Sequence, residues 1–191
     1  EARFLRAQSY YHALDLYGNV PFVDENYMSG GAQKPERIER AALFDWVESE
    51  LLAVQDELKD PRTNVYGRVD KAAAWAVLAR LYLNAEVYKG TKRYDDVITY
   101  TEKIINAGYS LKKDLLGGVD YGYQNLFMAD NHLNNPEVIF AINYDGNKTR
   151  TFGGTTFLVH AAIGGSMPAS DFGVNGGWGG LRVTKQFVGL F

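Results

Sequence analysis

Apolar residues are spaced most regularly in the segment 70–108. Four of them recur at i, i+3, i+4 and i+7, the repeat of one face of an α-helix: Trp75, Leu78, Ala79 and Tyr82. A second helical pattern follows at Tyr94–Ile105, and its acidic first turn suits the helix dipole. Asp70 is expected to cap the first helix and Gly108 to end the second. The segment is therefore predicted to form a helix hairpin with one buried stripe.

This hairpin resembles a tetratricopeptide repeat (TPR), because the four apolar residues follow the signature of that repeat's first helix. Ala79 replaces the usual Gly, at the position where two helices approach closely. The segment Glu86–Arg93 is longer than the tight turn of a standard repeat. We therefore predict an irregular, TPR-like pair. A plain antiparallel hairpin in a larger all-α domain is the alternative that the spacing leaves open.

Two more helices are predicted upstream of the hairpin. The first covers Ala2–Tyr17 and ends at Gly18–Pro21. Its apolar stripe contains Phe4, Ala7, Tyr11 and Leu14. The second covers Glu36–Leu58, after a loop that contains Gly30 and Gly31. Five residues of this second helix are expected to face inward: Ala42, Trp46, Leu51, Leu52 and Leu58. We interpret the two helices as an earlier TPR-like unit.

The character of the sequence changes after the hairpin. Fourteen of the 20 glycines lie beyond residue 112, and long helical periodicity disappears. Short elements are predicted at Gln124–Met128, as a helical turn, and at Val138–Ile142, as a strand or an extended core segment. Residues 151–182 are predicted to be loop, and loops of this length in compact domains are usually functional surfaces. A disordered linker is the alternative, but apolar residues such as Phe157 and Trp178 argue against a solvated coil. The predicted fold class is mainly α, with irregular TPR-like helix pairs and a glycine-rich, loop-dominated C-terminal part.

Composition narrows the classes of partner. Twenty basic residues against 23 acidic residues give a net charge of −3, and no basic run of the kind that neutralises phosphates occurs, so nucleic acid is not expected to bind. No Cys is present, which removes disulfides and thiol chemistry. No run of about 18 apolar residues occurs, so no membrane span is predicted. The chain starts at Glu1 rather than Met and has helical patterns at both ends, so truncation at both ends is expected.

A search for catalytic motifs gives no constellation. His12, His132 and His160 lack ligand-like spacing and are expected to be structural or exposed, so no zinc site is predicted. The segment Gly164–Pro168 lacks the closing Gly of a nucleophile elbow. No glycine-rich run carries a phosphate-loop motif between a strand and a helix. The residues alone therefore predict no catalytic site.

The segment around Trp178 indicates ligand binding instead. Two glycines precede this residue and two follow it, which permits tight backbone turns and leaves the indole accessible. An exposed indole can stack on the C–H face of a pyranose while nearby polar side chains, here Asn175 and Arg182, bind the hydroxyl groups. The alternative is that Trp178 packs on the helical half as part of the core.

Five segments of the chain, in order, resemble the SusD/RagB family. They are Ala2–Tyr11, Leu16–Pro21, Gly67–Lys71, Leu78–Ala85 and Gly176–Arg182. The resemblance implies an outer-membrane, cell-surface lipoprotein that is not an enzyme, that captures glycans or other nutrients and that passes them to a SusC-type TonB-dependent transporter. It also implies a helical scaffold of TPR-like units that carries a loop-rich ligand face.

The resemblance also sets the expected domain organisation. Family members are longer than this chain, so residues 1–191 are identified as part of one SusD-like domain. A TPR-like helical portion is expected at 1–108 and a loop-rich ligand-face portion at 109–191. The lipid anchor that would attach the protein to the membrane is expected to lie outside the sequence. The ligand-binding residues implied by the resemblance are Trp178, Arg182, Asn175 and Phe152.

No cofactor is required according to the resemblance, but some family members hold a structural calcium ion. Asp130 lies where an oxygen ligand is expected, with its partners beyond Phe191. Two other classes of function stay open from the residues alone. One is a TPR-like scaffold that recognises a peptide or protein, and the other is a carbohydrate-active enzyme.

Overall fold

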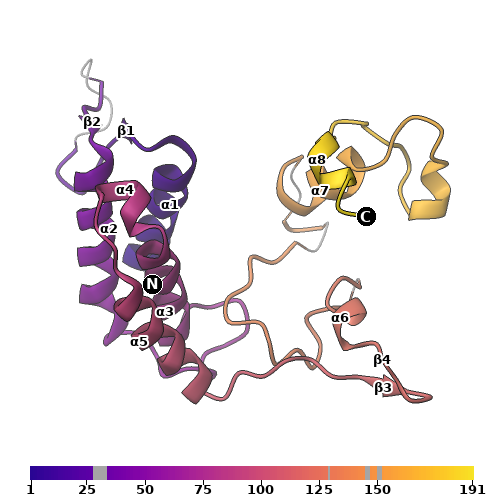
Figure 1. Cartoon of the computed structure of the whole chain (residues 1–191), viewed down its shortest axis with the longest axis horizontal. Coiled ribbons are helices and arrows are strands. Elements are labelled where there is room, and N and C mark those ends of the chain that lie inside the picture. The colour runs from indigo at the N-terminus through magenta and orange to yellow at the C-terminus, as the bar shows by residue number, and fades with distance from the viewer. Residues whose placement is uncertain (28–33, 129, 145–146, 150–151) are drawn as a thin grey trace. The chain divides into compact units, whose positions relative to one another are not determined.

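The computed structural model of the protein describes residues 1–27, 34–128, 130–144, 147–149 and 152–191 (Figure 1). Contacts within the chain divide it into two compact units. We call Glu1–Ala141 the helical unit and Ile142–Phe191 the glycine-rich unit. The predicted loop glycines Gly30 and Gly31 lie outside the described residues. The prediction that both parts belong to one SusD-like domain stays a prediction.

The helical unit is built on two pairs of helices that lie side by side (Figure 1). Helices α1 (Ala2–Tyr17) and α2 (Arg40–Gln55) form the first pair. Helices α3 (Lys71–Leu83) and α5 (Tyr94–Asn106) form the second pair, which has the most extensive helix–helix contact in the unit. Contact between α2 and α3 joins the pairs. The predicted mainly α fold with irregular TPR-like pairs is confirmed.

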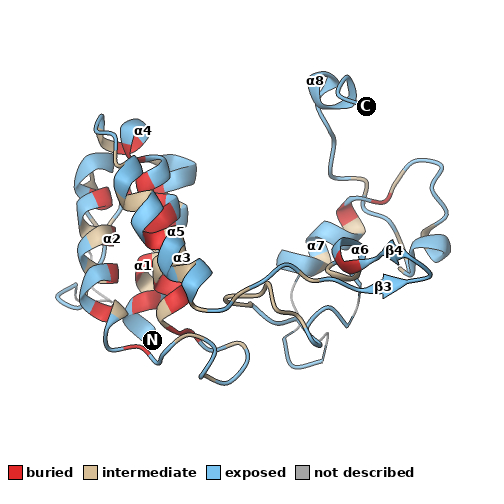
Figure 2. Ribbon diagram, turned by 60° about the horizontal axis from the view of Figure 1, so that its bottom comes forward, coloured by how far each residue is buried: buried red, intermediate tan, exposed pale blue. Residues whose placement is uncertain are grey.

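The core of this unit lies between the four helices, where their buried faces meet (Figure 2). The whole predicted stripe of α1 is buried: Phe4, Ala7, Tyr11 and Leu14. In α3, Leu78, Ala79 and Tyr82 are buried as predicted, whereas Trp75 is only partly buried. Asp70 accepts the backbone N–H of Ala73 at 3.2 Å, which confirms the predicted cap of α3.

The prediction for α2 was wrong in length and at two of the five residues expected to face inward. Leu51 and Leu58 are buried as predicted, and Trp46 is partly buried. The helix starts at Arg40 because Arg37–Ile38 (β2) pairs antiparallel with Val20–Pro21 (β1). Ala42 is exposed and Leu52 is 38% exposed, although both were expected to face inward. The buried residues are Leu43, Phe44, Val47, Leu51 and Val54. Because apolar residues are adjacent at 41–44 and 51–54, the sequence does not decide which of them face inward, and packing against α1, α3 and α4 selects the buried ones.

The long connection between α3 and α5 contains a helix of its own, α4 (Ala85–Lys89). It ends at Gly90, whose φ of 74° is the left-handed conformation that favours glycine at a helix end. The hydroxyl of Tyr88 on α4 donates to Asp15 of α1 at 2.6 Å. Helix α4 therefore ties the second pair to the first and accounts for the irregular spacing of the TPR-like repeat.

After α5 the helical unit continues as a hairpin, a short helix and an extended segment. Strands β3 (Leu115–Leu116) and β4 (Val119–Asp120) pair antiparallel, and α6 (Gly122–Asn125) follows. No strand forms in the described segment 130–144. Ile139 and Phe140 instead pack against the helical core, with the Phe140 ring edge-on to Phe4 at 5.6 Å. The alternative of a core segment is therefore confirmed for Ile139 and Phe140 but was wrong for Ile142, which is 68% exposed.

The glycine-rich unit has short helices joined by loops. These are α7 (Gly154–Ala161), the 3-10 helix η1 (Ala169–Phe172) and α8 (Lys185–Val188). The prediction of loop throughout 151–182 was wrong at α7. The glycines at its start favoured a loop, and the apolar run that follows them is short. Ala161 and Ile163 at the end of α7 are buried. None of the helices in the described parts of the chain has the length and apolar character needed to cross a bilayer.

Candidate functional site

The segment 176–182, which we call the Trp178 loop, runs across the C-terminal end of α7. Three of its backbone N–H groups donate to carbonyl oxygens there, in the pairs Trp178–His160, Gly179–Ile163 and Leu181–Ala161, at 2.9, 2.8 and 3.0 Å. Carbonyl groups at the end of a helix lack partners within the helix. The loop supplies those partners, and its own backbone is fixed by the same bonds.

Two glycines make this close approach sterically feasible. A Cβ atom on Gly177 would lie 2.4 Å from the carbonyl oxygen of Ile163. A Cβ atom on Gly164 would lie 2.7 Å from the Cα atom of Gly179. Real contacts are never this short, so side chains at these positions would push the loop away from α7. These glycines therefore bring two stretches of backbone together, a role that the sequence analysis did not predict.

The indole of Trp178 lies on the imidazole of His160. The ring centroids are 4.8 Å apart and the planes differ by 20°, which is a stacked arrangement. His160 Nδ1 is 2.8 Å from the carbonyl oxygen of Gly176, so Nδ1 carries the proton and donates. Trp178 is nevertheless 45% exposed. One face of the indole is therefore covered by His160, and the exposed area lies on the rest of the ring.

The structure brings some of the predicted ligand-binding residues together. The Phe152 ring is 85% exposed, and its centroid lies 6.4 Å from that of Trp178. Asn175 is exposed directly before the Trp178 loop and Arg182 is exposed at its end, where Arg182 donates to the carbonyl of Leu181. His160 was not predicted for this site. It reaches the indole only through the path of the loop across α7, which leaves no local signal in the sequence.

Asp130 lies in an exposed turn of the helical unit. Among the residues that the structure describes, no three or more His, Asp or Glu side chains gather in a way that could hold a metal ion. Calcium also accepts backbone carbonyl ligands, so Asp130 as a calcium ligand stays a prediction.

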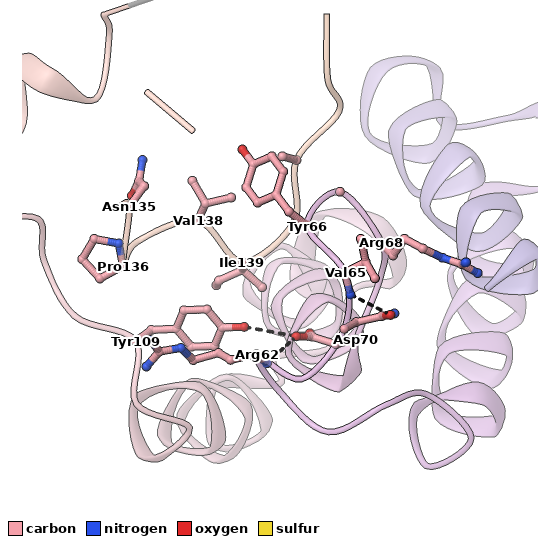
Figure 3. A pocket seen from close by; sticks show the side chains of 13 residues that line it. Arg62, Val65, Tyr66, Arg68, Asp70, Tyr109, Asn135, Pro136, Val138 and Ile139 are labelled. Atoms are coloured by element: carbon pink, nitrogen blue, oxygen red, sulfur yellow. Dashed lines mark hydrogen bonds between the residues drawn. The ribbon is translucent and has the colours of Figure 1, made fainter. Parts of the chain in front are cut away.

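A polar cavity of about 180 Å³ lies in the helical unit, between the loop 62–70 and the segment 135–141 (Figure 3). Asp70 is 4% exposed there and accepts the Arg62 backbone N–H at 2.8 Å and the Tyr109 hydroxyl at 3.4 Å. Burial, together with the negative charge of Asp70, raises the pKa of Tyr109 to about 12. Tyr109 thus keeps its proton at neutral pH. Because these groups satisfy one another, we interpret the cavity as structural.

The same carboxylate accounts for an unusual backbone conformation. Arg62 has a φ of 63°, in the left-handed region that residues other than glycine rarely adopt. The bond from its N–H to Asp70 holds this conformation, while its guanidinium donates to the carbonyl of Gly108 and lies over the Tyr109 ring. Asp70 therefore joins the start of α3, the preceding loop and the segment after α5.

A comparison with protein-family models gives no match. A comparison with curated proteins finds the starch-binding protein SusD of Bacteroides thetaiotaomicron, which is 38% identical over 194 residues. The alignment covers all of this chain and 33% of that protein. The chain therefore spans about a third of the length of the curated relative.

Two solved structures are similar to the fold. A SusD-like protein from Bacteroides fragilis matches 74% of this chain and 26% of its own length, with a TM-score of 0.59 and 25% identity. The surface glycan-binding protein A of Bacteroides uniformis matches 75% of this chain and 30% of its own length, with a TM-score of 0.54 and 27% identity. The similarity in fold thus agrees with the similarity in sequence.

Proposed function

Because this chain belongs to the SusD/RagB family, we propose that it is part of a glycan-binding protein for polysaccharide utilisation. In this proposal the protein is not an enzyme. It captures an oligosaccharide or polysaccharide at the cell surface, where a lipid anchor attaches it to the outer membrane, and passes the ligand to a SusC-type TonB-dependent transporter. Glycan capture is supported by two relatives, one named as a starch-binding protein and the other as a surface glycan-binding protein.

The observation that carries the proposal is the way in which Trp178 is held in place. Its backbone is bonded to the end of α7 and its ring is backed by His160, so the indole is already fixed before a ligand arrives. A fixed ring loses little entropy on binding. Stacking and hydroxyl hydrogen bonds contribute about 0.5–1.5 kcal/mol each, so several sugar rings must contribute to a useful affinity.

An α-1,4-glucan is the first ligand to test, because the curated relative is named as a starch-binding protein. Such a polymer is uncharged, so the exposed indole and the nearby Phe152 ring are suited to it better than a charged cluster would be. Asn175 and Arg182 are proposed to bond hydroxyl groups at the two ends of the loop.

The test compares the full-length protein with its Trp178→Ala variant. Loss of the stacking surface should weaken maltoheptaose binding about tenfold, measured by calorimetry. In gels that contain starch, the variant should be retarded less than the unmodified protein. The thermal unfolding midpoint should change little, because the bonds between the loop and α7 are made by the main chain.

Phe172→Ala is the matched control, since Phe172 is 49% exposed in the same unit and lies outside the Trp178 loop. It should bind maltoheptaose as the unmodified protein does. Equal losses of stability and binding in Trp178→Ala would support the core role of Trp178 instead. Retention of a protein partner without any response to oligosaccharides would support the TPR-like scaffold, and turnover of the glycan would support an enzyme.

A further inference from the structure

The helical unit carries an open groove of about 540 Å³ between α5 and the loop that precedes α3. This volume lies within the range of about 300–1,000 Å³ that is typical of ligand sites. Pro61 and Trp75 line one side, and Thr99, Glu102, Lys103 and Asn106 line the other. We call this feature the Trp75 groove. It is separate in sequence from the Trp178 loop and belongs to the other compact unit.

Trp75 is held in a defined orientation in this groove. Its Nε1–H donates to Gln55 Oε1 at the end of α2, at 3.2 Å. The ring is only partly buried, unlike its neighbours Ala74 and Leu78 in α3, so part of it forms the wall of the groove. A bonded, partly exposed indole of this kind offers a flat apolar surface to a ligand.

The side of α5 that faces the groove is polar along its length. Its four lining residues occur at i, i+3, i+4 and i+7, so they form one stripe of the helix: Thr99, Glu102, Lys103 and Asn106. The Thr99 hydroxyl donates to a backbone carbonyl within α5. In the described parts of the chain, the side chains of Glu102 and Asn106 have no hydrogen-bond or ion-pair partner. Both are exposed and free to bond a ligand.

Lys103 completes the polar stripe. Its ammonium lies 4.5 Å from the Tyr100 ring centroid, well inside the range of a cation–π contact, and 5.7 Å from that of Trp75, near the outer limit. The ammonium therefore lies over both rings, where it can donate to a ligand on the indole. Glu102 and Lys103 carry opposite charges, so the groove has no net preference for an anion or a cation.

We propose that the Trp75 groove is a second binding subsite for a neutral glycan, with a sugar ring on the indole and its hydroxyls bonded by Glu102, Asn106 and Lys103. This inference rests on the proposed function, since it assumes that the ligand is a glycan.

The experiment uses full-length protein labelled with 5-fluorotryptophan and titrated with maltoheptaose. Fluorine resonances of Trp75 and Trp178 are assigned from Trp→Phe variants. We expect maltoheptaose to shift both resonances in the unmodified protein. In the Trp178→Ala variant, it should continue to shift the Trp75 resonance. A Trp75 resonance that stays unchanged overturns the second subsite, whatever Trp178 does. The Trp178 resonance reports separately on the proposed function, so the two failures are distinguishable.

A second variant tests the polar stripe without removing Trp75, whose burial would complicate the result. Glu102→Ala combined with Asn106→Ala should weaken the affinity read from the Trp75 resonance about fivefold or more, because two hydroxyl partners are lost. Ile105→Ala is the matched control, because Ile105 is exposed on α5 and does not line the groove. An unchanged affinity in the double variant would contradict the proposed contacts.

Discussion

At the scale of single residues, the position of Trp178 depends on two contacts with α7 and the residues that follow it. The sequence was sufficient to identify Trp178 as an exposed aromatic residue between glycines, and Trp178 is indeed 45% exposed. It was not sufficient to predict His160 beneath the ring or the carbonyl of Ile163 against Gly177. Both contacts arise from the loop's path across α7, and local spacing does not encode that path.

Replacement of Gly177 by Ala should therefore damage the site. The new methyl group would meet the Ile163 carbonyl oxygen at 2.4 Å, so the loop must move and the indole with it. We expect maltoheptaose affinity to fall about as far as in Trp178→Ala, that is, about tenfold. Calorimetric titration of the full-length variant measures this effect.

Gly176→Ala is a matched control one residue away. A Cβ atom at Gly176 would meet nothing within 4 Å, and neither glycine has a positive φ. The two variants therefore differ in steric contact rather than in backbone conformation. Similar binding by both variants would show that the close approach to α7 does not position the indole.

At the scale of elements, one acidic residue links the first pair of helices. Glu50 on α2 accepts from Arg3 at 2.7 Å and from Arg6 at 2.9 Å, both on α1. Arg6 also binds Glu25 in the loop that follows β1. Hydrogen bonding to Arg3, and then to Arg6, lowers the pKa of Glu50 below its ordinary value. The carboxylate is therefore more strongly favoured in the folded protein than in the unfolded chain.

This pKa shift predicts a pH-dependent contribution to stability. A lowered folded-state pKa gives stabilisation that is complete above the unfolded-state pKa of about 4.3 and is lost as the pH falls through the folded-state value. Glu50→Gln should thus lower the free energy of unfolding at pH 7 by about 1–2 kcal/mol, a value reduced by the solvent exposure of Arg3. Urea unfolding at pH 7 and pH 3 measures the difference between the two proteins.

The difference should shrink at pH 3, where the unmodified protein has begun to lose the same interaction. Glu57→Gln serves for comparison, because Glu57 is exposed just beyond α2. It should alter stability little at either pH. A loss that is the same at pH 3 and pH 7 would mean that packing of the side chain, not its charge, links the helices.

The same scale shows where sequence patterns were sufficient. Helix α1 was predicted correctly because one apolar repeat runs along its whole length and Gly18–Pro21 ends it, and α5 because its acidic first turn marks the start. In α2 the predicted inward residues did not follow one such repeat, and its contacts with α1, α3 and α4 decide which residues are buried. Helix α7 was missed because eight residues beginning with glycine give too short a pattern. The length and regularity of the apolar repeat therefore set the limit of prediction.

At the scale of the whole molecule, charge is expected to contribute little to ligand capture. The net charge is −3, and the proposed ligand is neutral. Raising salt from about 0.1 M to 1 M shortens the Debye length from about 10 to 3 Å, so Coulomb attraction over longer distances would be screened. We expect maltoheptaose affinity to change by less than about twofold across this range.

Calorimetry of the full-length protein at both salt concentrations tests this expectation. A protein that captured a charged polymer would lose affinity by orders of magnitude over the same range. A steep salt dependence would therefore contradict a neutral ligand, while leaving the membership of the family unaffected.

The family itself was predictable from the sequence, because its five segments are contiguous motifs that need no tertiary information. The second groove was not predictable in that way. Trp75 matches the repeat signature that normally marks a core residue, and only the packing of α3 beside α5 shows that part of the ring borders a groove.

The three main-chain bonds between the Trp178 loop and α7 form irrespective of which side chain occupies position 178. Another aromatic residue at this position would therefore occupy the same place, because the main-chain bonds would be unchanged. Under the proposed function, exchange of this one residue would change the size and chemistry of the sugar-stacking surface and leave the main-chain bonds that support it in place.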